Sequence, residues 1–402
     1  MVSNRGRKQI AVLFKEEVRT FNVQNIAGCE RVFIDDVSFL KSAKLLRRAY
    51  MAAKYVKGTR KNALLPFTIP YPHRLLDSLL LFAQRSLIFK KIINRVYKIS
   101  LLIAQLWYAG FFVIRESKTK IYYVIQTPLV ALFFPKKTTV MYHNFYYGLD
   151  YIFKILYLFQ KDADFTKFVF VSQSLLDQFS KEYPIILRSR CYVLHNSVDT
   201  KKFKQYSKKT EKISFIFLSA WVKEKGIHIL PKIIEMINKK YKDKVNFIIG
   251  GSTNLWSLSE EMYKRYVKTE IRINRLSKNF SNVTIVGLIE HSNIPVLLSS
   301  ATYCLLPSTW EEPNSLLAKE SLACGTPVIA FDLGGNKEII SDNVDGFLVR
   351  GKNVKDYIDF LDKLISNFDK DKYLIMSNHA IKNAQRYPLI KRHQKLLDIL
   401  FS

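Results

Sequence analysis

Short apolar runs recur along the chain, and segments with helical spacing separate them. In the first half the runs are 9–14, 121–125, 138–142, 168–171 and 192–194, and in the second half 213–218, 245–249, 283–286, 302–306 and 328–331. Continuous apolar runs of this length are typical of strands that are buried on both faces. Strands that alternate with helices predict parallel sheets, so we predict an α/β fold of doubly wound sheets.

A lysine-rich segment without apolar pattern, residues 200–211, separates the two sets of strands. We therefore predict two Rossmann-like domains. Residues 1–205 form the N-terminal domain and residues 206–385 the C-terminal domain. A chain of 402 residues is long enough for two domains of ordinary size.

The helical patterns of the first half are less uniform. A helix is predicted from the turn after the first strand to about Leu46, a short one at 128–134, and another from about Ser174. Residues 74–109 alternate apolar and basic positions with helical spacing. Such helices either lie on a membrane surface or pack an apolar stripe on the sheet, and the pattern leaves both open. The longest apolar run, residues 99–114, is shorter than the about 20 residues that a membrane span needs.

Two carboxylates stand out between the last two predicted strands, because seven residues separate Glu312 from Glu320. Glu312 falls in the loop after a strand, at the edge of an open α/β sheet where ligands bind. Glu320 shares a helix face with Leu316 and Leu317, which we expect to be buried. A buried carboxylate needs a donor, which is either a ligand hydroxyl or a neighbouring cation or loop.

The stretch from Pro307 to Ala330 resembles the E-x7-E signature of retaining glycosyltransferases of family four, and the similarity continues through 334–340 and 343–349. The resemblance implies the GT-B fold, in which two Rossmann-like domains face a cleft. It also implies that a last helix, 386–402, packs back on the N-terminal domain. A nucleotide-diphosphate sugar would be the donor substrate, with no cofactor or metal required.

The resemblance also assigns roles to residues. Glu312 would hold the donor sugar and Glu320 the ribose, while Lys225 would contact the diphosphate. His143 ends a predicted strand and would contact the sugar near the reacting carbon, although a structural role for this histidine stays open. Glu312, His143 and Lys225 are the predicted catalytic residues. The other predicted donor-binding residues are Glu320, Asn314, Ser315, Leu316, Leu317, Gly28 and Gly250.

The chain departs from the family pattern at two places. Ala220 stands where the family has an arginine, and Ala27 stands where it has the first glycine of a G-G-x-E-R turn, so that only Gly28 remains. Either another basic residue replaces the arginine, or donor binding is weaker, or the protein is not catalytic.

Other charged and metal-binding residue types change the picture little. We predict that Glu338 caps its own helix and that Asp35 and Asp36 lie on a solvated helix face. Four cysteines and seven histidines show no metal-ligand spacing, and no D-x-D motif ends a strand. The sequence therefore predicts no metal site, and its cysteines are read as reduced cytosolic thiols.

The net charge of +29 is the strongest compositional signal. Residues 41–98 carry 14 basic side chains against one acid, Asp77. Such a region suits anionic lipids, nucleic acid or phosphorylated substrates, or else it is a solvated face. Residues 1–8 lack the apolar core of a signal peptide. We expect a cytoplasmic protein, peripheral on the inner face of the cell membrane.

The sequence thus predicts a retaining hexosyltransferase that transfers a sugar from a nucleotide-diphosphate sugar to a glycan acceptor, lipid-linked, in cell-surface polysaccharide or glycoconjugate assembly. Two other classes stay open. One is a non-catalytic GT-B relative that binds nucleotide sugar or a partner, which Ala220 and Ala27 motivate. The other is a nucleic-acid-binding protein, which the charge motivates but no recognised module supports.

Overall fold

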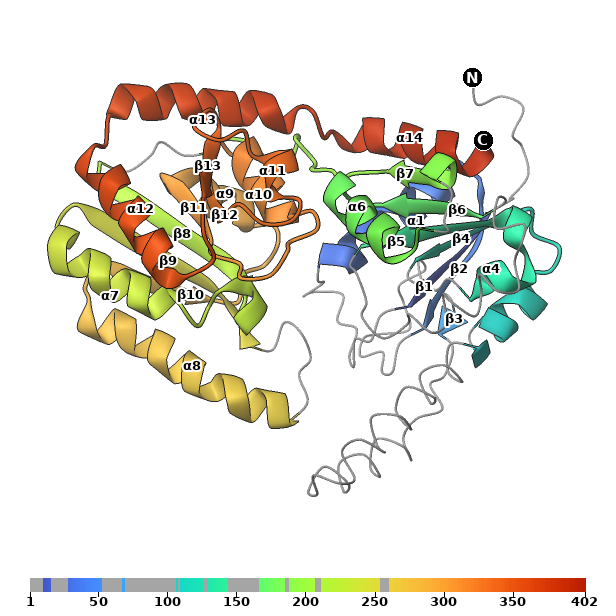
Figure 1. Ribbon diagram of the computed structural model, residues 1–402, viewed down its shortest axis with the longest axis horizontal. Coiled ribbons are helices and arrows are strands. Elements are labelled where there is room, and N and C mark those ends of the chain that lie inside the picture. The colour runs from blue at the N-terminus through green and yellow to red at the C-terminus, as the bar shows by residue number, and fades with distance from the viewer. Residues whose placement is uncertain are drawn as a thin grey trace.

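The structure is a computed structural model. It describes residues 10–15, 28–52, 67–68, 106–107, 109–125, 129–143, 166–184, 188–206, 211–253 and 260–402. These residues form two parallel sheets with helices around them, one sheet in each half of the chain (Figure 1). Ala27 and most of the basic segments 41–98 and 74–109 lie outside the described residues.

The N-terminal sheet has seven strands in the order β3-β2-β1-β4-β5-β6-β7. Its strands are β1 (Ile10–Lys15), β2 (Leu46–Ala52), β3 (Phe67–Thr68), β4 (Ile121–Ile125), β5 (Thr138–Tyr142), β6 (Lys167–Phe170) and β7 (Cys191–Val193). Every pairing is parallel. The labelled helices of this half are α1 (Gly28–Ser42), α4 (Val130–Phe133) and α6 (Gln173–Glu182), with 3-10 turns η1 (Pro135–Lys137) and η3 (Arg188–Arg190).

The C-terminal sheet has six strands in the order β10-β9-β8-β11-β12-β13, also all parallel. They are β8 (Ile213–Ala220), β9 (Val245–Ser252), β10 (Val283–Gly287), β11 (Tyr303–Leu306), β12 (Val328–Phe331) and β13 (Gly346–Val349). The helices are α7 (Leu230–Tyr241), α8 (Glu260–Asn279), α9 (Ile294–Ser300), α10 (Leu316–Ala323), α11 (Asn336–Ile339), α12 (Val354–Ser366), α13 (Lys370–Ala384) and α14 (Leu389–Phe401), with the 3-10 turn η4 (Lys223–Lys225).

The predicted α/β fold with doubly wound parallel sheets is confirmed, and each predicted strand is present with bounds within three residues. The prediction that the first helix runs to Leu46 is wrong. Helix α1 ends at Ser42, Lys44 adopts a left-handed φ of 57°, and β2 begins at Leu46. The arginines at the start of β2 hid the strand pattern: Arg47 and Arg48 pair with Glu116, whose carboxylate is fully buried.

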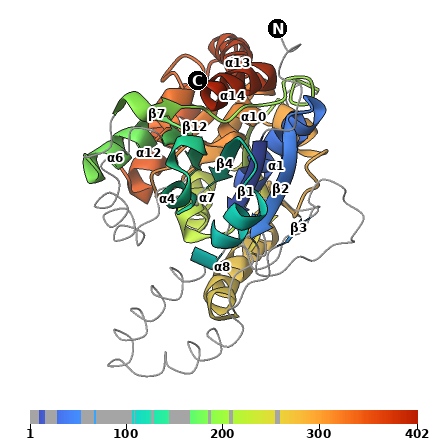
Figure 2. The same cartoon turned by 90° about the vertical axis from the view of Figure 1, so that its right-hand side faces the viewer.

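The final helix belongs to the N-terminal core. Leu396, Leu397, Ile399 and Leu400 of α14 pack in the same apolar cluster as β1, β4 and β5. Figures 1 and 2 show α13 and α14 following one another along one side of the molecule, with α14 over the N-terminal sheet. The last element therefore returns to the half of the molecule in which the chain begins.

The prediction that the Asp35–Asp36 pair is solvated is wrong for Asp36, which has no exposed surface. Arg392 of α14 donates to both of its carboxylate oxygens, and the Tyr123 hydroxyl donates to Oδ2 at 2.9 Å. A buried ion pair thus fastens α14 to α1 and β4. Within the part of the chain that the structure describes, no helix has the length and apolar character to cross a bilayer.

Candidate functional site

The loop after β11 and helix α10 carry the two glutamates. The Ser315 hydroxyl caps α10 by accepting from the Ala318 N–H at 3.2 Å. Gly325, with φ of 69°, ends the helix in the left-handed conformation that glycine favours. In a parallel sheet this loop lies at the carboxyl edge of the strands, so Glu312 and the first turn of α10 occupy the usual ligand edge of the C-terminal sheet.

Glu312 is buried, with 7% of its surface exposed. Its Oε2 accepts from Lys225 Nζ at 2.6 Å and from Trp310 Nε1 at 2.9 Å. The Lys225 ammonium also lies 5.2 Å from the centre of the Trp310 ring. Lys225 lies in η4, shortly after β8, and Glu312 follows β11. Strands β8 and β11 are neighbours in the sheet, so the segments that follow them bring a cation and a carboxylate together.

The turn at Gly334 and Gly335 supports the Glu312 loop from behind. The Gly335 N–H donates to the Glu312 carbonyl oxygen at 2.8 Å. A Cβ on Gly335 would lie 1.9 Å from the Pro313 carbonyl oxygen, so no side chain fits there. The backbone packing that places Glu312 therefore requires glycine at this position.

Glu320 is 4% exposed and is held by groups from both domains. Arg31 Nη1 of α1 donates to its Oε1 at 2.6 Å, and His291 Nε2 lies 3.4 Å from the same oxygen. Lys202 Nζ in turn lies 2.8 Å from His291 Nδ1. Burial raises the pKa of Glu320, but the Arg31 charge and the His291 contact outweigh it, so the pKa lies below its usual value. The sequence left open whether a ligand hydroxyl, a cation or a loop contacts this carboxylate, and the structure shows a cation, Arg31.

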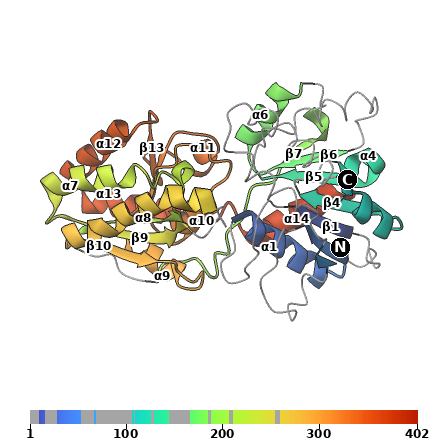
Figure 3. The same cartoon turned by 90° about the horizontal axis from the view of Figure 1, so that it is seen from below.

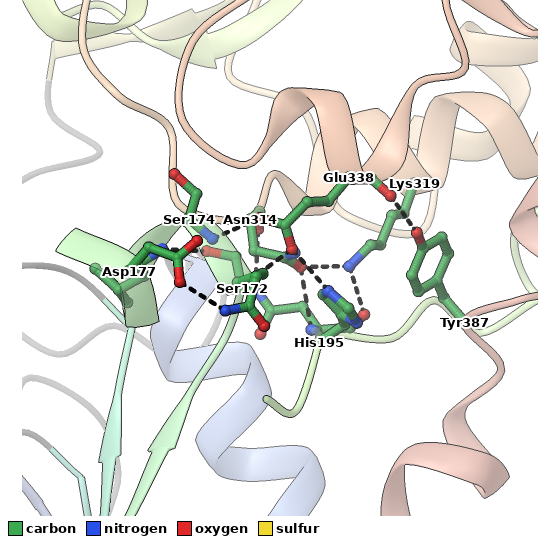
Figure 4. A network of polar contacts seen from close by, with 11 residues as sticks. Ser172, Ser174, Asp177, His195, Asn314, Lys319, Glu338 and Tyr387 are labelled. Carbon is green, nitrogen blue, oxygen red and sulfur yellow. Dashed lines mark hydrogen bonds and ion pairs between the residues drawn. The ribbon is translucent and has the colours of Figure 1, made fainter. Parts of the chain in front are cut away.

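Asn314 and Lys319 fasten the start of α10 to the segment that crosses between the domains. Asn314 Oδ1 accepts from the Asn196 N–H at 3.1 Å, and Asn196 Nδ2 donates to the Asn314 carbonyl oxygen at 2.9 Å. Lys319, fully buried, donates to Asn314 Oδ1 and to the Asn196 carbonyl oxygen, and its ammonium lies 4.3 Å from the Tyr387 ring centre. Burial, and then the charge of Arg392, lower the pKa of Lys319. Figure 4 shows Lys319 between Asn314 and Tyr387.

The prediction that Glu338 caps its own helix is wrong. Its carboxylate accepts from the Gln173 and Ser174 N–H groups, at 2.8 and 2.7 Å, which begin α6 of the other domain. His195 Nε2 lies 3.0 Å from it (Figure 4). Burial raises the pKa of Glu338, but these hydrogen bonds outweigh it and lower the pKa. These donors lie 143 to 165 residues away in the chain, so the local pattern around Glu338 does not indicate them.

His143 follows β5 and is 3% exposed. Burial, and then the Arg392 charge, lower the pKa of His143 from 6.5 to about 3. Its Nε2 has no hydrogen-bond partner among the described residues. The ring is therefore neutral at physiological pH, with one polar atom left for a partner outside the described protein groups.

The remaining predicted residues lie within helices and strands or at their ends. Gly28 begins α1, and Gly250 lies within β9, where a Cβ would come 2.6 Å from Leu218. Ala220 ends β8 and is buried. Leu316 and Leu317 form the first turn of α10, where backbone N–H groups lack helical partners. No cluster of three metal-ligating side chains occurs among the described residues.

Sequence reasoning assigned no role to Arg31, although it is the last residue of the G-G-x-E-R turn at 27–31, and it missed His291. Arg31 stands three residues after Gly28, in the first turn of α1. A cation there opposes the helix dipole, which is the argument that singled out Lys225 and could have singled out Arg31. His291 carries no comparable signal, because it follows a strand without any motif around it.

Comparisons with known proteins agree with this architecture. Residues 198–386 match the family model described as glycosyl transferases group 1. The spore coat protein SA of Bacillus subtilis is 28% identical over 156 residues, which cover 39% of this chain and 40% of that protein. An uncharacterized glycosyltransferase of Methanocaldococcus jannaschii is 27% identical over 210 residues, 48% of each protein. The aligned segments thus span about half or less of these relatives.

Solved structures resemble the whole chain. The crystal structure of HepE from Anabaena in complex with UDP covers 98% of this chain, and 99% of its own chain is covered, with a TM-score of 0.69 and 17% identity. The alignment with a glycosyltransferase from Rickettsia africae covers 98% of this chain and 98% of that chain, with a TM-score of 0.66 and 16% identity. The chain therefore has the GT-B fold, with the matched family segment spanning the C-terminal sheet.

Proposed function

We propose that this chain is a retaining glycosyltransferase that moves a sugar from a nucleotide-diphosphate sugar to a glycan acceptor. One observation carries the proposal most. At the ligand edge of the C-terminal sheet, two buried carboxylates, Glu312 and Glu320, are each held by one cation, Lys225 or Arg31. The match of residues 198–386 to group 1 glycosyl transferases supports the same function.

The donor has three parts, and the site offers a partner for each. Carboxylates accept hydrogen bonds in fixed directions, so Glu312 orients the sugar hydroxyls and Glu320 the ribose hydroxyls. Lys225 and the first N–H groups of α10, those of Leu316 and Leu317, bind the diphosphate. Because these donors are already in place, they stabilise the negative charge that grows on the leaving phosphate.

Transfer breaks the bond between the anomeric carbon and the phosphate oxygen, and the electron pair leaves with the phosphate. The acceptor hydroxyl attacks on the same face and forms the new C–O bond. Its proton passes to the leaving phosphate oxygen, so the anomeric configuration is kept. In this scheme the neutral His143 imidazole hydrogen-bonds the sugar near the reacting carbon and takes up no proton.

We assign a lipid-linked acceptor at the inner face of the cell membrane, in polysaccharide or glycoconjugate assembly. Support comes from the net charge of +29 and from the basic segment 41–98, most of which lies outside the described residues. A protein with such a surface concentrates at anionic headgroups. The proposed reaction requires no metal or cofactor, so a chelator should leave the activity unchanged.

A panel of nucleotide sugars tests the proposal. The purified protein is incubated with UDP-, GDP- and ADP-sugars and a membrane lipid extract, and the products are analysed by mass spectrometry and by NMR of the anomeric proton. Consumption of one donor with a retained configuration is the expected result. An inverted product would contradict the mechanism. Donor binding without any transfer or hydrolysis would instead identify a non-catalytic relative.

A further inference from the structure

Each of the two buried carboxylates, Glu312 and Glu320, forms an ion pair with a basic side chain, which their proposed roles toward hydroxyl groups do not require. Lys225 Nζ lies 2.6 Å from Glu312, and Arg31 Nη1 lies 2.6 Å from Glu320. The Arg31 side chain is 24% exposed, and its Nε is buried without a hydrogen-bond partner among the described residues. Lys225 thus contacts one oxygen of Glu312, and Arg31 contacts one oxygen of Glu320 and also His291 Nε2, while Arg31 Nε keeps an unused donor.

Binding of a nucleotide sugar would change both pairs. Ribose hydroxyls that donate to Glu320 would compete with Arg31 for Oε1, and sugar hydroxyls that donate to Glu312 would compete with Lys225 for Oε2. A partly buried cation whose carboxylate is taken by a hydroxyl is stabilised by another anion nearby. The diphosphate links the ribose to the sugar, so it lies between the two carboxylates when both ends are held.

We propose that Arg31 is a second cation for the donor diphosphate, and that it exchanges Glu320 for phosphate when the ribose binds. This inference rests on the proposed function. A guanidinium matches phosphate oxygens with paired N–H donors, and the free Nε supplies one of them. Ala220, small and buried at the end of β8, has no charge to offer there.

Lys202 does not fill this role. Its ammonium contacts His291 Nδ1 at 2.8 Å rather than a carboxylate, so donor binding at Glu320 leaves that contact in place. Lys202 therefore orients His291 against the ribose carboxylate, whereas Arg31 is the group that the ribose releases.

The exchange links the two domains through the ligand. Arg31 belongs to α1 of the N-terminal domain, and Figure 3 shows α1 and α10 approaching each other where the domains meet. A diphosphate held by the C-terminal domain would thus gain a cation from the N-terminal domain. The bound donor would then help to fix the orientation of the two domains.

Calorimetric titration of nucleoside diphosphates and their matching nucleosides tests the inference. Arg31→Ala and Arg31→Met, the second of which keeps the aliphatic stem, should weaken diphosphate binding by roughly 10- to 100-fold, the usual loss for one charge-assisted contact. Nucleoside affinity should stay within about twofold of the parent. Arg31→Lys, which keeps the charge but not the paired N–H donors, should bind the diphosphate more weakly than the parent and more tightly than Arg31→Ala. Lys41→Ala, which removes an exposed cation from the last turn of the same helix, should change neither affinity.

Three results would overturn the inference. Equal losses for diphosphate and nucleoside would place Arg31 on the ribose or in the fold. Tighter binding of both ligands by Arg31→Ala would make Arg31 a competitor of the donor. An unchanged diphosphate affinity in Arg31→Ala and Arg31→Met would exclude a contact between Arg31 and the phosphate. A parent protein that binds neither ligand would instead refute the proposed function, which this titration therefore separates from the inference.

Discussion

Glu312 and Glu320 are close in sequence but are held by contacts of very different range. Glu312 accepts from Lys225, 87 residues away within the same domain, and Glu320 from Arg31, 289 residues away in the other domain. In the proposed function their chemical tasks differ as well. A carboxylate that orients the sugar acts mainly in the transition state, whereas a carboxylate that holds the ribose acts equally in both states.

This difference predicts separable effects of two conservative changes. Glu312→Gln should lower kcat by about 100-fold or more while donor affinity falls little, because the sugar loses orientation where charge develops. Glu320→Gln should weaken donor affinity by roughly 10-fold or more with kcat largely kept. Steady-state kinetics with calorimetry measures both, and Glu311→Gln, an exposed neighbour, is the control. Unfolding of Glu320→Gln with unchanged donor affinity would assign that carboxylate to the fold alone.

His143 predicts a pH dependence of stability. Its pKa is about 3 in the folded protein and ordinarily 6.5, so between these values the unfolded chain binds more protons. The contribution of the neutral His143 to the free energy of unfolding should therefore be fully present above about pH 6.5. It should decrease as the pH drops toward 3, by at most about 1.4 kcal/mol per pH unit. Urea unfolding at pH 7, 6 and 5 should show a smaller slope in His143→Gln. Identical slopes in variant and parent would contradict the buried neutral ring.

For single residues, the sequence predicts those features that depend on the residue's own helix or strand. The strand end placed Glu312, and helical spacing placed Glu320 on a buried face, since both follow from local pattern. The partners of Asp36 and Glu338 lie 356 and 165 residues away, so no local pattern indicates them. A local pattern alone therefore predicts a solvated Asp36 and a local role for Glu338.

At the scale of elements, α14 is held by an apolar face and one buried ion pair. Its leucines pack in the N-terminal core, and Arg392 donates to Asp36 of α1. His393 stacks on Phe39 with ring centres 4.1 Å apart. The last helix was expected from the family resemblance, and most strands were predictable because their apolar runs are clear. Strand β2 was not predictable, because its arginines pair with the buried Glu116.

The buried pair predicts a large cost for removing one partner. Arg392→Met leaves the Asp36 carboxylate uncompensated, so the free energy of unfolding should fall by about 3–5 kcal/mol. The double variant Asp36→Asn, Arg392→Met should recover much of this loss, since no buried charge then remains. Chemical denaturation measures both, and Lys395→Ala on the exposed face of α14 should change stability by about 0.5 kcal/mol or less. A cost for Arg392→Met no larger than that of Lys395→Ala would show that apolar packing alone holds α14.

At the scale of the whole molecule, the two halves are joined by two chain crossings and by side chains near the site. The crossings pair directly, since the Val198 N–H donates to the Tyr387 carbonyl oxygen at 3.0 Å. Lys319 contacts both crossings, and Glu338 caps α6 of the other half. The sequence predicted the two halves from the break in apolar pattern. It could not predict these contacts, because they depend on how the domains meet.

The net charge predicts how the whole protein meets a membrane. Each basic side chain near an anionic bilayer contributes about 1 kcal/mol, and salt screens the attraction. The protein should sediment with anionic liposomes at low salt, be released at high salt, and ignore neutral liposomes. Replacing Lys90, Lys91, Arg95 and Lys98 with Gln should reduce this binding and leave nucleotide binding intact. Equal binding to anionic and neutral liposomes would remove the support for a lipid-linked acceptor.

The central claim is that Lys225 receives the diphosphate of a nucleotide sugar whose ends rest on Glu312 and Glu320. Its most direct test is calorimetric titration of the preferred nucleoside diphosphate and of its nucleoside into the parent and into Lys225→Ala, with Lys223→Ala, an exposed neighbour in the same turn, as the control. Loss of one charge-assisted contact should weaken diphosphate binding by roughly 10- to 100-fold, with nucleoside affinity and the control unchanged. An unchanged diphosphate affinity in Lys225→Ala, or an equal loss for the bare nucleoside, would contradict the claim.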